Sequence, residues 1–139
     1  MERAVFPSDS ETRLKGDISM KTILLVDDST TLLMSIKAIL EKAGYAVQTA
    51  TGGDAALKLL AGMKPNLMIT DLNMPGMDGI TLIKEVKKLP ACRFMPVLVM
   101  TTESQQQKRT DARAAGATGW LVKPVKPEEL VQVLKKLIP

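Results

Sequence analysis

Hydrophobic residues along this chain follow two alternating patterns, short apolar runs and longer stretches with apolar residues at helical spacing. Four of the short runs are continuous, which is typical of strands buried on both faces of a parallel sheet. A fifth segment, residues 45–49, has the composition of a short strand. The pattern therefore predicts five strands, at residues 23–26, 45–49, 67–70, 97–100 and 120–122.

Helical periodicity follows each of these strands. Ser29 or Thr30 can cap the first helix, and Gly44 can end it. Asp54 is expected to cap the second helix, and Pro127 to open the last. The later helices are predicted at residues 55–63, 80–89, 104–115 and 127–138. Five strand–helix units thus occupy residues 21–139. Residues 1–20 are polar, without a sustained period, and we expect them to form a disordered or loosely docked extension.

Polar residues with ligating or reactive side chains stand directly after four of the strands. Asp27 and Asp28 follow the first strand, Asp71 the third, Thr101 the fourth and Lys123 the fifth. The carboxyl ends of parallel strands meet at one edge of the sheet, where ligands bind in such folds. We therefore expect a single site that contains three carboxylates, one hydroxyl and one ammonium group.

This set of groups suits phosphoryl transfer. Three unpaired carboxylates would repel one another, and a Mg²⁺ ion removes that repulsion. Lys123 supplies a fixed positive charge, and Thr101 can hydrogen-bond an oxygen that gains charge. Asp71 stands alone after the central strand and is the best nucleophile, able to form an acyl phosphate. The adjacent Asp27 and Asp28 are better suited to holding metal.

Each of these residues also has a purely structural interpretation. Asp27 and Asp28 could cap a helix, and Asp71 could begin a turn. Thr101 could cap the next helix, and Lys123 could lie in a solvated loop. The functional interpretation is favoured because all of these residues stand at the same end of their strands.

Composition excludes several other functions. The chain has no histidine, which rules out a Ser-His-Asp triad and a histidine-based zinc site. Cys92 is the only cysteine, so no internal disulfide can form and a reducing compartment fits. No apolar stretch approaches the length of a membrane span, and we expect a cytoplasmic protein. The net charge of +4 comes from basic residues spread over the predicted helices, with 3% aromatic residues, which favours a solvated surface over nucleic-acid binding.

Taken together, these motifs resemble the receiver domain of bacterial two-component response regulators, most like the stand-alone chemotaxis type. The matching segments are Val26-Asp27-Asp28-Ser29, Asp71-Leu72-Asn73-Met74-Pro75-Gly76-Met77-Asp78-Gly79, Thr101 and Lys123-Pro124. The resemblance covers residues 21–139. It implies a doubly wound α/β fold of the flavodoxin/CheY-like kind, with a five-stranded parallel sheet in the order 2-1-3-4-5 and helices on both faces.

The resemblance also implies roles for the acidic residues. Asp71 would accept a phosphoryl group from the phosphohistidine of a histidine kinase, with Mg²⁺ as cofactor. Asp28, Asp71 and the backbone carbonyl of Asn73 would hold the Mg²⁺, and Asp27 would act directly or through water. Asn73 and Glu103 resemble residues of a fast self-hydrolysing receiver, which implies a short-lived phosphorylated state.

A switch between two conformations is implied as well. Lys123 would contact the phosphoryl group, and its bond to Pro124 would be cis. Thr101 would move to bond a phosphoryl oxygen. Trp120 occupies the position of an aromatic side chain that swings between exposed and buried places, although a static half-buried edge residue is an equal alternative.

A downstream protein would then read the face formed by residues 104–115, Trp120 and residues 127–138. The resemblance implies a monomeric or dimeric signalling protein that contacts neither nucleic acid nor membrane and is no enzyme beyond self-dephosphorylation. The alternative is a Mg²⁺-dependent aspartate-nucleophile phosphatase. Such enzymes normally carry Asp-x-Asp after the first strand, whereas Asp27 and Asp28 are adjacent here.

Overall fold

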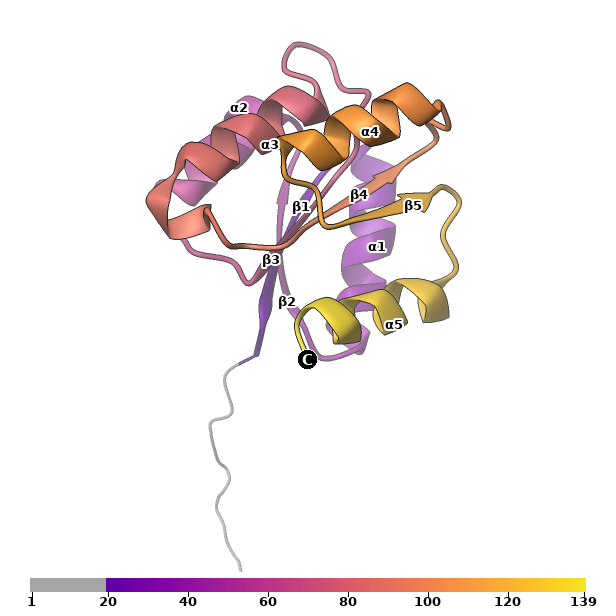
Figure 1. Cartoon of the computed structure of the whole chain (residues 1–139). Coiled ribbons are helices and arrows are strands. Elements are labelled where there is room, and N and C mark those ends of the chain that lie inside the picture. The colour runs from indigo at the N-terminus through magenta and orange to yellow at the C-terminus, as the bar shows by residue number, and fades with distance from the viewer. Residues whose placement is uncertain (1–19) are drawn as a thin grey trace, which may run out of the picture.

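A single parallel sheet forms the centre of the computed structural model, which describes residues 20–139 (Figure 1). The expectation for residues 1–20 therefore lies, except for Met20, outside the described residues. The strand order is β2-β1-β3-β4-β5, as the resemblance implied, and every pairing is parallel. The strands are β1 (Thr22–Val26), β2 (Ala46–Ala50), β3 (Leu67–Thr70), β4 (Val97–Thr101) and β5 (Gly119–Val122).

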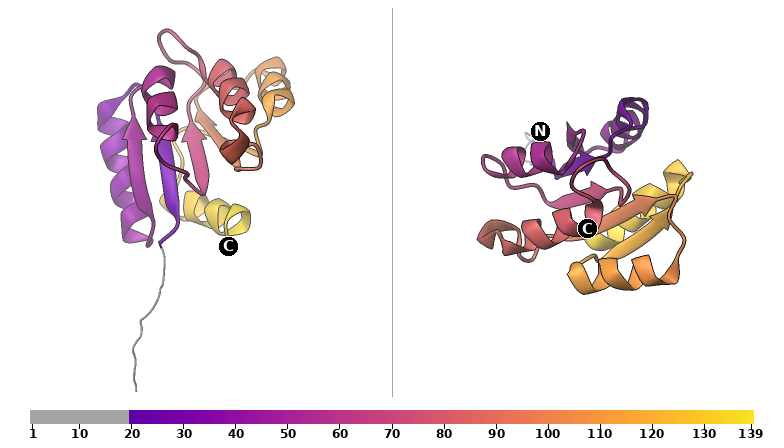
Figure 2. Two further views of the ribbon diagram at one scale, coloured as in Figure 1. Left: turned by 90° about the vertical axis from the view of Figure 1, so that its left-hand side faces the viewer. Right: turned by 90° about the horizontal axis from the view of Figure 1, so that it is seen from above.

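Helices cover both faces of this sheet (Figure 2). They are α1 (Thr30–Lys42), α2 (Gly53–Leu60), α3 (Gly79–Lys88), α4 (Gln106–Ala115) and α5 (Pro127–Leu137), with a short 3₁₀ turn η2 (Pro90–Cys92). Helices α1 and α5 pack on one face, and α2, α3 and α4 pack on the other. Among residues 20–139, no helix has both the length and the apolar character needed to cross a membrane.

Successive side chains of each strand point to opposite faces of the sheet, which divides the core into two layers. In β1, Ile23 and Leu25 face α1 and α5, whereas Leu24 and Val26 face the other three helices. The central strand β3 and its neighbour β4 are buried at every position. A strand covered on both faces must be apolar throughout, which explains the continuous runs in the sequence.

Most element boundaries agree with the sequence pattern, and the cap of α1 is confirmed. The Ser29 hydroxyl accepts a hydrogen bond from the Leu32 N–H at 3.2 Å, and Gly44 follows the helix with a φ of 101°. Strand β2 begins one residue later than predicted because the Tyr45 N–H still bonds the Leu40 carbonyl of α1.

Two predicted helix starts are wrong. Gly52, not Asp54, is the N-cap of α2, and Asp54 lies inside the first turn, where its charge still favours the helix. Helix α4 begins at Gln106 rather than at residue 104. The Glu103 carboxylate accepts a hydrogen bond from the Gln105 N–H at 3.2 Å, which holds this segment in a turn before the helix.

The loop from β3 to α3 folds tightly against the carboxyl end of β3. Asp78 caps α3, since its Oδ1 accepts a hydrogen bond from the Thr81 N–H at 2.8 Å. The Gly79 N–H then bonds the Leu72 carbonyl at 2.9 Å. A Cβ at position 79 would overlap the backbone carbonyl oxygen of Asp71 and come within 2.8 Å of the Leu72 Cα. Only glycine allows this close approach of the helix to the strand end.

We therefore expect Gly79→Ala to lower the free energy of unfolding by about 2 kcal/mol, because backbone atoms must move to admit the methyl group. Gly62→Ala is the matched control, since nothing lies within 4 Å of a Cβ at that position. It should change stability by no more than about 0.5 kcal/mol. Urea unfolding of both variants measures the difference. Equal stabilities would contradict the close approach at Gly79.

Candidate functional site

Backbone hydrogen bonds of the sheet continue past three of the strand ends. The Asp27 N–H bonds the Ala50 carbonyl at 3.1 Å, and the Asp71 N–H bonds the Val26 carbonyl at 3.1 Å. The Lys123 N–H likewise bonds the Thr101 carbonyl at 2.9 Å. These bonds fix the three residues at the same edge of the sheet, as the sequence pattern predicted. The Lys123–Pro124 peptide bond is cis, also as expected.

Lys123 pairs with two carboxylates at this edge. Its Nζ lies 2.6 Å from Asp27 Oδ2 and 2.9 Å from Asp71 Oδ2. Asp27 and Asp71 are only 2% and 8% exposed. The interpretation of Lys123 as a solvated loop residue is therefore wrong, since the ammonium is hydrogen-bonded to two buried acids.

The second oxygen of each buried carboxylate is held by backbone N–H groups. Asp71 Oδ1 accepts hydrogen bonds from the N–H groups of Leu72 at 2.6 Å and Asn73 at 3.3 Å. Asp27 Oδ1 accepts one from the Ser29 N–H at 2.9 Å. Local turns and long-range ion pairs thus orient the same two side chains, so the interpretation of Asp71 as a turn former is correct as well. The interpretation of Asp27 and Asp28 as helix caps is wrong, because Ser29 is the N-cap of α1.

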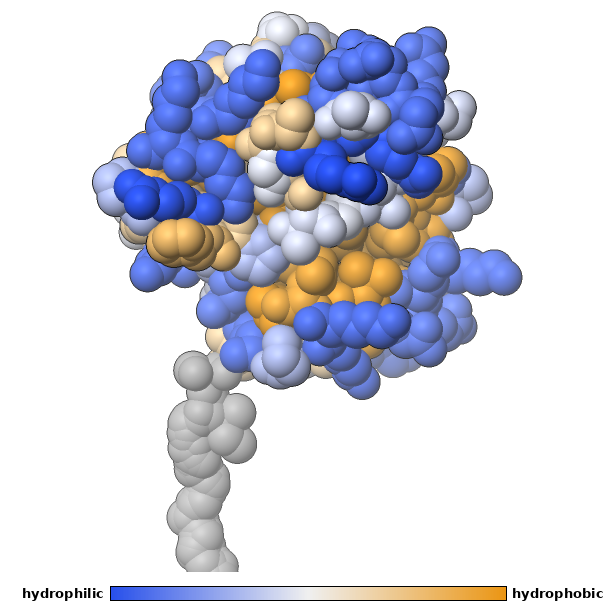
Figure 3. Space-filling view, viewed as in Figure 1, coloured by the Kyte–Doolittle hydropathy of each residue, from blue (hydrophilic) through white to orange (hydrophobic). Residues whose placement is uncertain are grey.

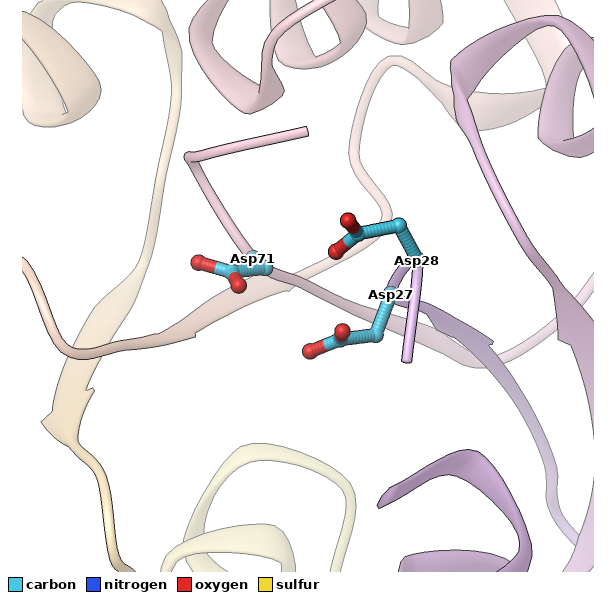
Figure 4. Close-up of side chains that lie close together, drawn as sticks. All are labelled: Asp27, Asp28 and Asp71. Carbon is cyan, nitrogen blue, oxygen red and sulfur yellow. The ribbon is translucent and has the colours of Figure 1, made fainter. Parts of the chain in front are cut away.

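Three carboxylates form a cluster that could hold a metal ion. One oxygen from each of Asp27, Asp28 and Asp71 lies within 4.8 Å of the others. Figure 4 shows Asp27 and Asp28, which follow β1, extending toward Asp71 at the end of β3. Asp28 is exposed, so an ion bound here would keep part of its water shell. Hard carboxylate oxygens with access to water fit Mg²⁺.

Opposing effects set the pKa values in this cluster. Burial alone would raise the pKa of Asp71, but the nearby Thr101 hydroxyl, the Lys123 ammonium and the Asn73 N–H together bring it below its ordinary value. Burial alone would lower the pKa of Lys123, but its contacts with Asp27 and Asp71 outweigh that and raise it. At neutral pH the Asp71 carboxylate is therefore ionised and lies beside the charged Lys123 ammonium group.

Thr101 is fully buried at the end of β4. Its Oγ1 accepts a hydrogen bond from the Glu103 N–H at 3.2 Å. It does not cap α4, because the N-cap of that helix is Gln105, which makes no side-chain capping bond. Glu103 is half-buried and Asn73 is exposed. The Asn73 N–H bonds the Asp71 carboxylate, whereas the Glu103 N–H bonds only the Thr101 hydroxyl.

Trp120 is half-buried on β5, the edge strand next to β4. The guanidinium of Arg109 on α4 lies 5.3 Å from the centre of the indole ring, within the range of a cation–π interaction. The indole N–H is buried and has no hydrogen-bond acceptor among the described residues. The half-buried position agrees with both interpretations of Trp120, and movement of the ring stays a prediction.

Two features of the site had no clear signal in the sequence. The buried Thr70 hydroxyl donates a hydrogen bond to the Asp71 carbonyl at 2.8 Å, on the backbone side of the predicted nucleophile. Arg109 covers Trp120 although the two residues belong to different elements. Helical spacing placed Arg109 on α4, but only the packing of α4 against β5 brings it onto the ring.

Loss of the Lys123 ammonium should leave two carboxylates without a counter-charge. We expect Lys123→Met to lower the free energy of unfolding by about 2 kcal/mol at pH 7 without divalent metal, since solvent at the rim screens part of the penalty. Lys88→Met is the matched control, because its ion pair with Glu85 is exposed, and it should cost at most about 0.5 kcal/mol.

The same variant gives a test by pH. The raised pKa of Lys123 means that its stabilisation is complete below its ordinary pKa of 10.5 and is lost as pH rises through the folded value. The lowered pKa of Asp71 means that its stabilisation is present above 3.8 and is lost as pH falls through the folded value. The stability gap between native protein and Lys123→Met should therefore be widest between about pH 4 and about pH 10 and should narrow as pH falls below 3.8 or rises above 10.5, as measured by urea unfolding. A gap independent of pH would contradict the ion pairs.

Known proteins with the same sequence pattern and fold were found by comparison. The chain is 37% identical over 119 residues to the chemotaxis protein CheY of Thermotoga maritima, which covers 84% of this chain and 97% of that protein. The solved structure of Vibrio cholerae CheY4 has a TM-score of 0.84 at 38% identity and covers 86% of this chain and 100% of its own. The receiver domain of the sensor histidine kinase PA1611 from Pseudomonas aeruginosa, solved with magnesium in its active-site cleft, has a TM-score of 0.80 at 28% identity, with coverage of 86% and 98%. Residues 23–135 match the response regulator receiver domain, and the chain therefore belongs to that family.

Proposed function

We propose that this protein is a phosphorylation-controlled switch in which Asp71 accepts a phosphoryl group from a histidine kinase. The observation that carries the proposal is the environment of the Asp71 carboxylate. One oxygen is held by two backbone N–H groups, and the other contacts Lys123, beside two further acids. This arrangement orients a nucleophilic oxygen and supplies positive charge next to it.

Asp71 would take the phosphoryl group directly from the phosphohistidine of the kinase. An Asp71 carboxylate oxygen attacks phosphorus, the P–N bond of the donor phosphohistidine breaks, and the imidazole leaves and takes up a proton. Asp27, Asp28 and Asp71 would hold Mg²⁺, which when bound neutralises charge on the transferring group. The backbone carbonyl of Asn73 completes the proposed ligand set. The magnesium-bound receiver of PA1611 supports this assignment.

Lys123 and Thr101 would then couple phosphorylation of Asp71 to a change of conformation. A phosphoryl group adds nearly two negative charges and strong hydrogen-bond acceptors beside both residues. Lys123 would bind one phosphoryl oxygen, and the buried Thr101 would turn from Glu103 to bond another. Trp120 lies on the neighbouring strand and would follow this shift. The phosphoryl group favours the active state only by its greater affinity for that state.

The protein would act as a stoichiometric signal and not as an enzyme with a diffusible substrate. The alternative, a phosphatase with an aspartate nucleophile, is not favoured, because the chain belongs to a receiver family. Repeated turnover of a phosphate ester would support that alternative. A single phosphoryl group retained on Asp71 would oppose it.

A signalling role in the bacterial cytoplasm fits the family, with a histidine kinase as donor and a downstream protein as target. The names of CheY relatives support chemotaxis as the first pathway to test. The proposed target surface combines α4, Trp120 and α5. This surface lies next to β4, the strand that ends in Thr101. A movement of Thr101 would therefore reach the surface over a short distance.

Intact-mass analysis after treatment with acetyl phosphate and Mg²⁺ tests the phosphoryl acceptor. We expect the native protein to gain the mass of one phosphoryl group, and Asp71→Asn or chelation of Mg²⁺ to abolish the gain. Asp54→Asn is the matched control, since Asp54 is an exposed acid in α2 and its loss should change nothing. Beryllofluoride should alter Trp120 fluorescence in the native protein and in Asp54→Asn but not in Asp71→Asn. Equal labelling of native protein and Asp71→Asn would exclude Asp71 as the acceptor.

The lifetime of the phosphorylated state tests the roles of Asn73 and Glu103. The Asn73 N–H bonds the Asp71 carboxylate and the Glu103 N–H bonds the Thr101 hydroxyl, so both residues follow groups of the site closely along the chain. Polar side chains at these positions can orient a hydrolytic water. We expect Asn73→Ala and Glu103→Ala to lengthen the lifetime several-fold after the donor is removed, as followed by mass. Ser104→Ala, an exposed neighbour, should leave it unchanged. Equal lifetimes in all of these proteins would contradict a tuning role.

A further inference from the structure

We propose that Thr70 is a positioning residue for the phosphoryl acceptor, because its hydroxyl fixes the peptide group that holds the Asp71 carboxylate. This inference rests on the proposed function, since it concerns the same site. Thr70 is the last residue of β3 and the only polar residue of that strand. Its side chain is fully buried, and its hydroxyl donates a hydrogen bond to the Asp71 carbonyl oxygen at 2.8 Å.

Packing alone does not explain a hydroxyl at this position. The strand pairing puts Thr70 beside Val26 of β1 and Val99 of β4, and both valines belong to the apolar layer under α2, α3 and α4. Figure 3 shows hydrophilic residues over the outer side of α3 and α4, whereas the layer beneath these helices is apolar. Valine has nearly the same shape as threonine and would suit this layer without the cost of burying a hydroxyl. The hydrogen bond to Asp71 is therefore the feature that distinguishes Thr70 from a valine here.

The Asp71 carbonyl depends on the Thr70 hydroxyl. Within residues 20–139 no other donor bonds this oxygen, and the nearby Gly79 N–H bonds the Leu72 carbonyl instead. The start of α3 also crowds the oxygen, since a Cβ at position 79 would overlap it. A buried carbonyl without a donor is costly, so the hydroxyl of Thr70 keeps this peptide group in its observed orientation.

Both ends of the peptide group between Asp71 and Leu72 are thereby engaged. Its carbonyl accepts from Thr70, and its N–H donates to Asp71 Oδ1 at 2.6 Å. Because a peptide group is planar, a fixed carbonyl direction also fixes the direction of the N–H. A donor on the carbonyl also polarises the peptide group and strengthens its N–H as a donor. Thr70 thus limits rotation of the carboxylate without touching it, and Asp71 Oδ2 stays directed at Lys123.

This restriction bears on the rate of phosphorylation. A nucleophile that is poorly aligned with phosphorus reacts more slowly even when the phosphoryl donor binds normally. Loss of the Thr70 hydroxyl should therefore lower the maximal rate constant and leave the donor concentration for half-maximal rate unchanged. A residue that only stabilises the fold would not separate the two quantities in this way.

The first measurement is the NMR spectrum of the full-length protein without metal or phosphoryl donor. A short hydrogen bond moves an amide proton downfield, so we expect a downfield Leu72 amide signal in the native protein. Thr70→Val should move this signal upfield, and Thr70→Ser, which keeps the hydroxyl, should retain it. Val99→Ala is the matched control, because it loosens the same layer at the neighbouring register position and should leave the Leu72 signal in place.

The second measurement is phosphorylation over a range of acetyl phosphate concentrations with Mg²⁺, followed by intact mass. We expect Thr70→Val to lower the maximal rate constant about tenfold. Thr70→Ser and Val99→Ala should stay close to the native rate. If Thr70→Val does not fold, Thr70→Cys takes its place, since a thiol is only a weak donor and should lower the rate and shift the signal by intermediate amounts.

Four results would overturn the inference. They are a native rate in Thr70→Val, an unmoved Leu72 signal in that variant, an equal loss of rate in Val99→Ala, and a Thr70→Ser protein that behaves like Thr70→Val. The NMR measurement needs no phosphoryl group, so it tests the positioning role independently of the reaction. Absence of labelling in the native protein would instead overturn the proposed function.

Discussion

The contact of one ammonium group with two buried carboxylates is the constraint on which this site depends. Lys123 lies 96 residues from Asp27 and 52 residues from Asp71 along the chain, yet it contacts both. Without that contact, acids brought together by the sheet would repel one another at neutral pH. The parallel register places all three residues at one edge, so the site exists only when β1, β3 and β5 are all in place. The charge balance of the site and the completeness of the sheet are therefore linked.

Much of this arrangement could be predicted from the sequence because a buried parallel strand has a clear end. Each continuous apolar run stops at the end of its strand, and the next residue stands at a known edge of the sheet. The positions of Asp27, Asp71 and Lys123 directly after such runs therefore predict that they share one site. The order of the strands came instead from the resemblance to a family, since periodicity alone does not specify which strands pair. The resemblance and the apolar pattern supplied different parts of the prediction.

The capping preferences of single residues do not predict the backbone position where tertiary packing determines it. Asp54 is the better capping residue by chemistry, yet α2 begins at Gly53, where a Cβ would crowd the Met77 side chain that packs against the start of the helix. The approach of Gly79 to the Asp71 carbonyl follows from the same kind of crowding. The contact between Arg109 and Trp120 joins α4 to β5, and neither helical spacing nor strand alternation encodes it. Such contacts depend on how elements pack, which a one-dimensional pattern does not contain.

The proposed switch couples two electrostatic layers that differ in exposure. The inner layer, Lys123 with Asp27 and Asp71, is mostly buried, so added salt affects it less than an exposed contact. The outer layer, Arg109 and Arg113, is exposed and should be strongly screened. Trp120 lies between them, since β5 pairs with the strand that ends in Thr101 and the ring touches Arg109. Linkage requires that a partner favouring the active state stabilise the phosphorylated form by the same free energy. Salt should therefore weaken a contact made through Arg109 and Arg113 more than it weakens the contacts of Lys123 with Asp27 and Asp71.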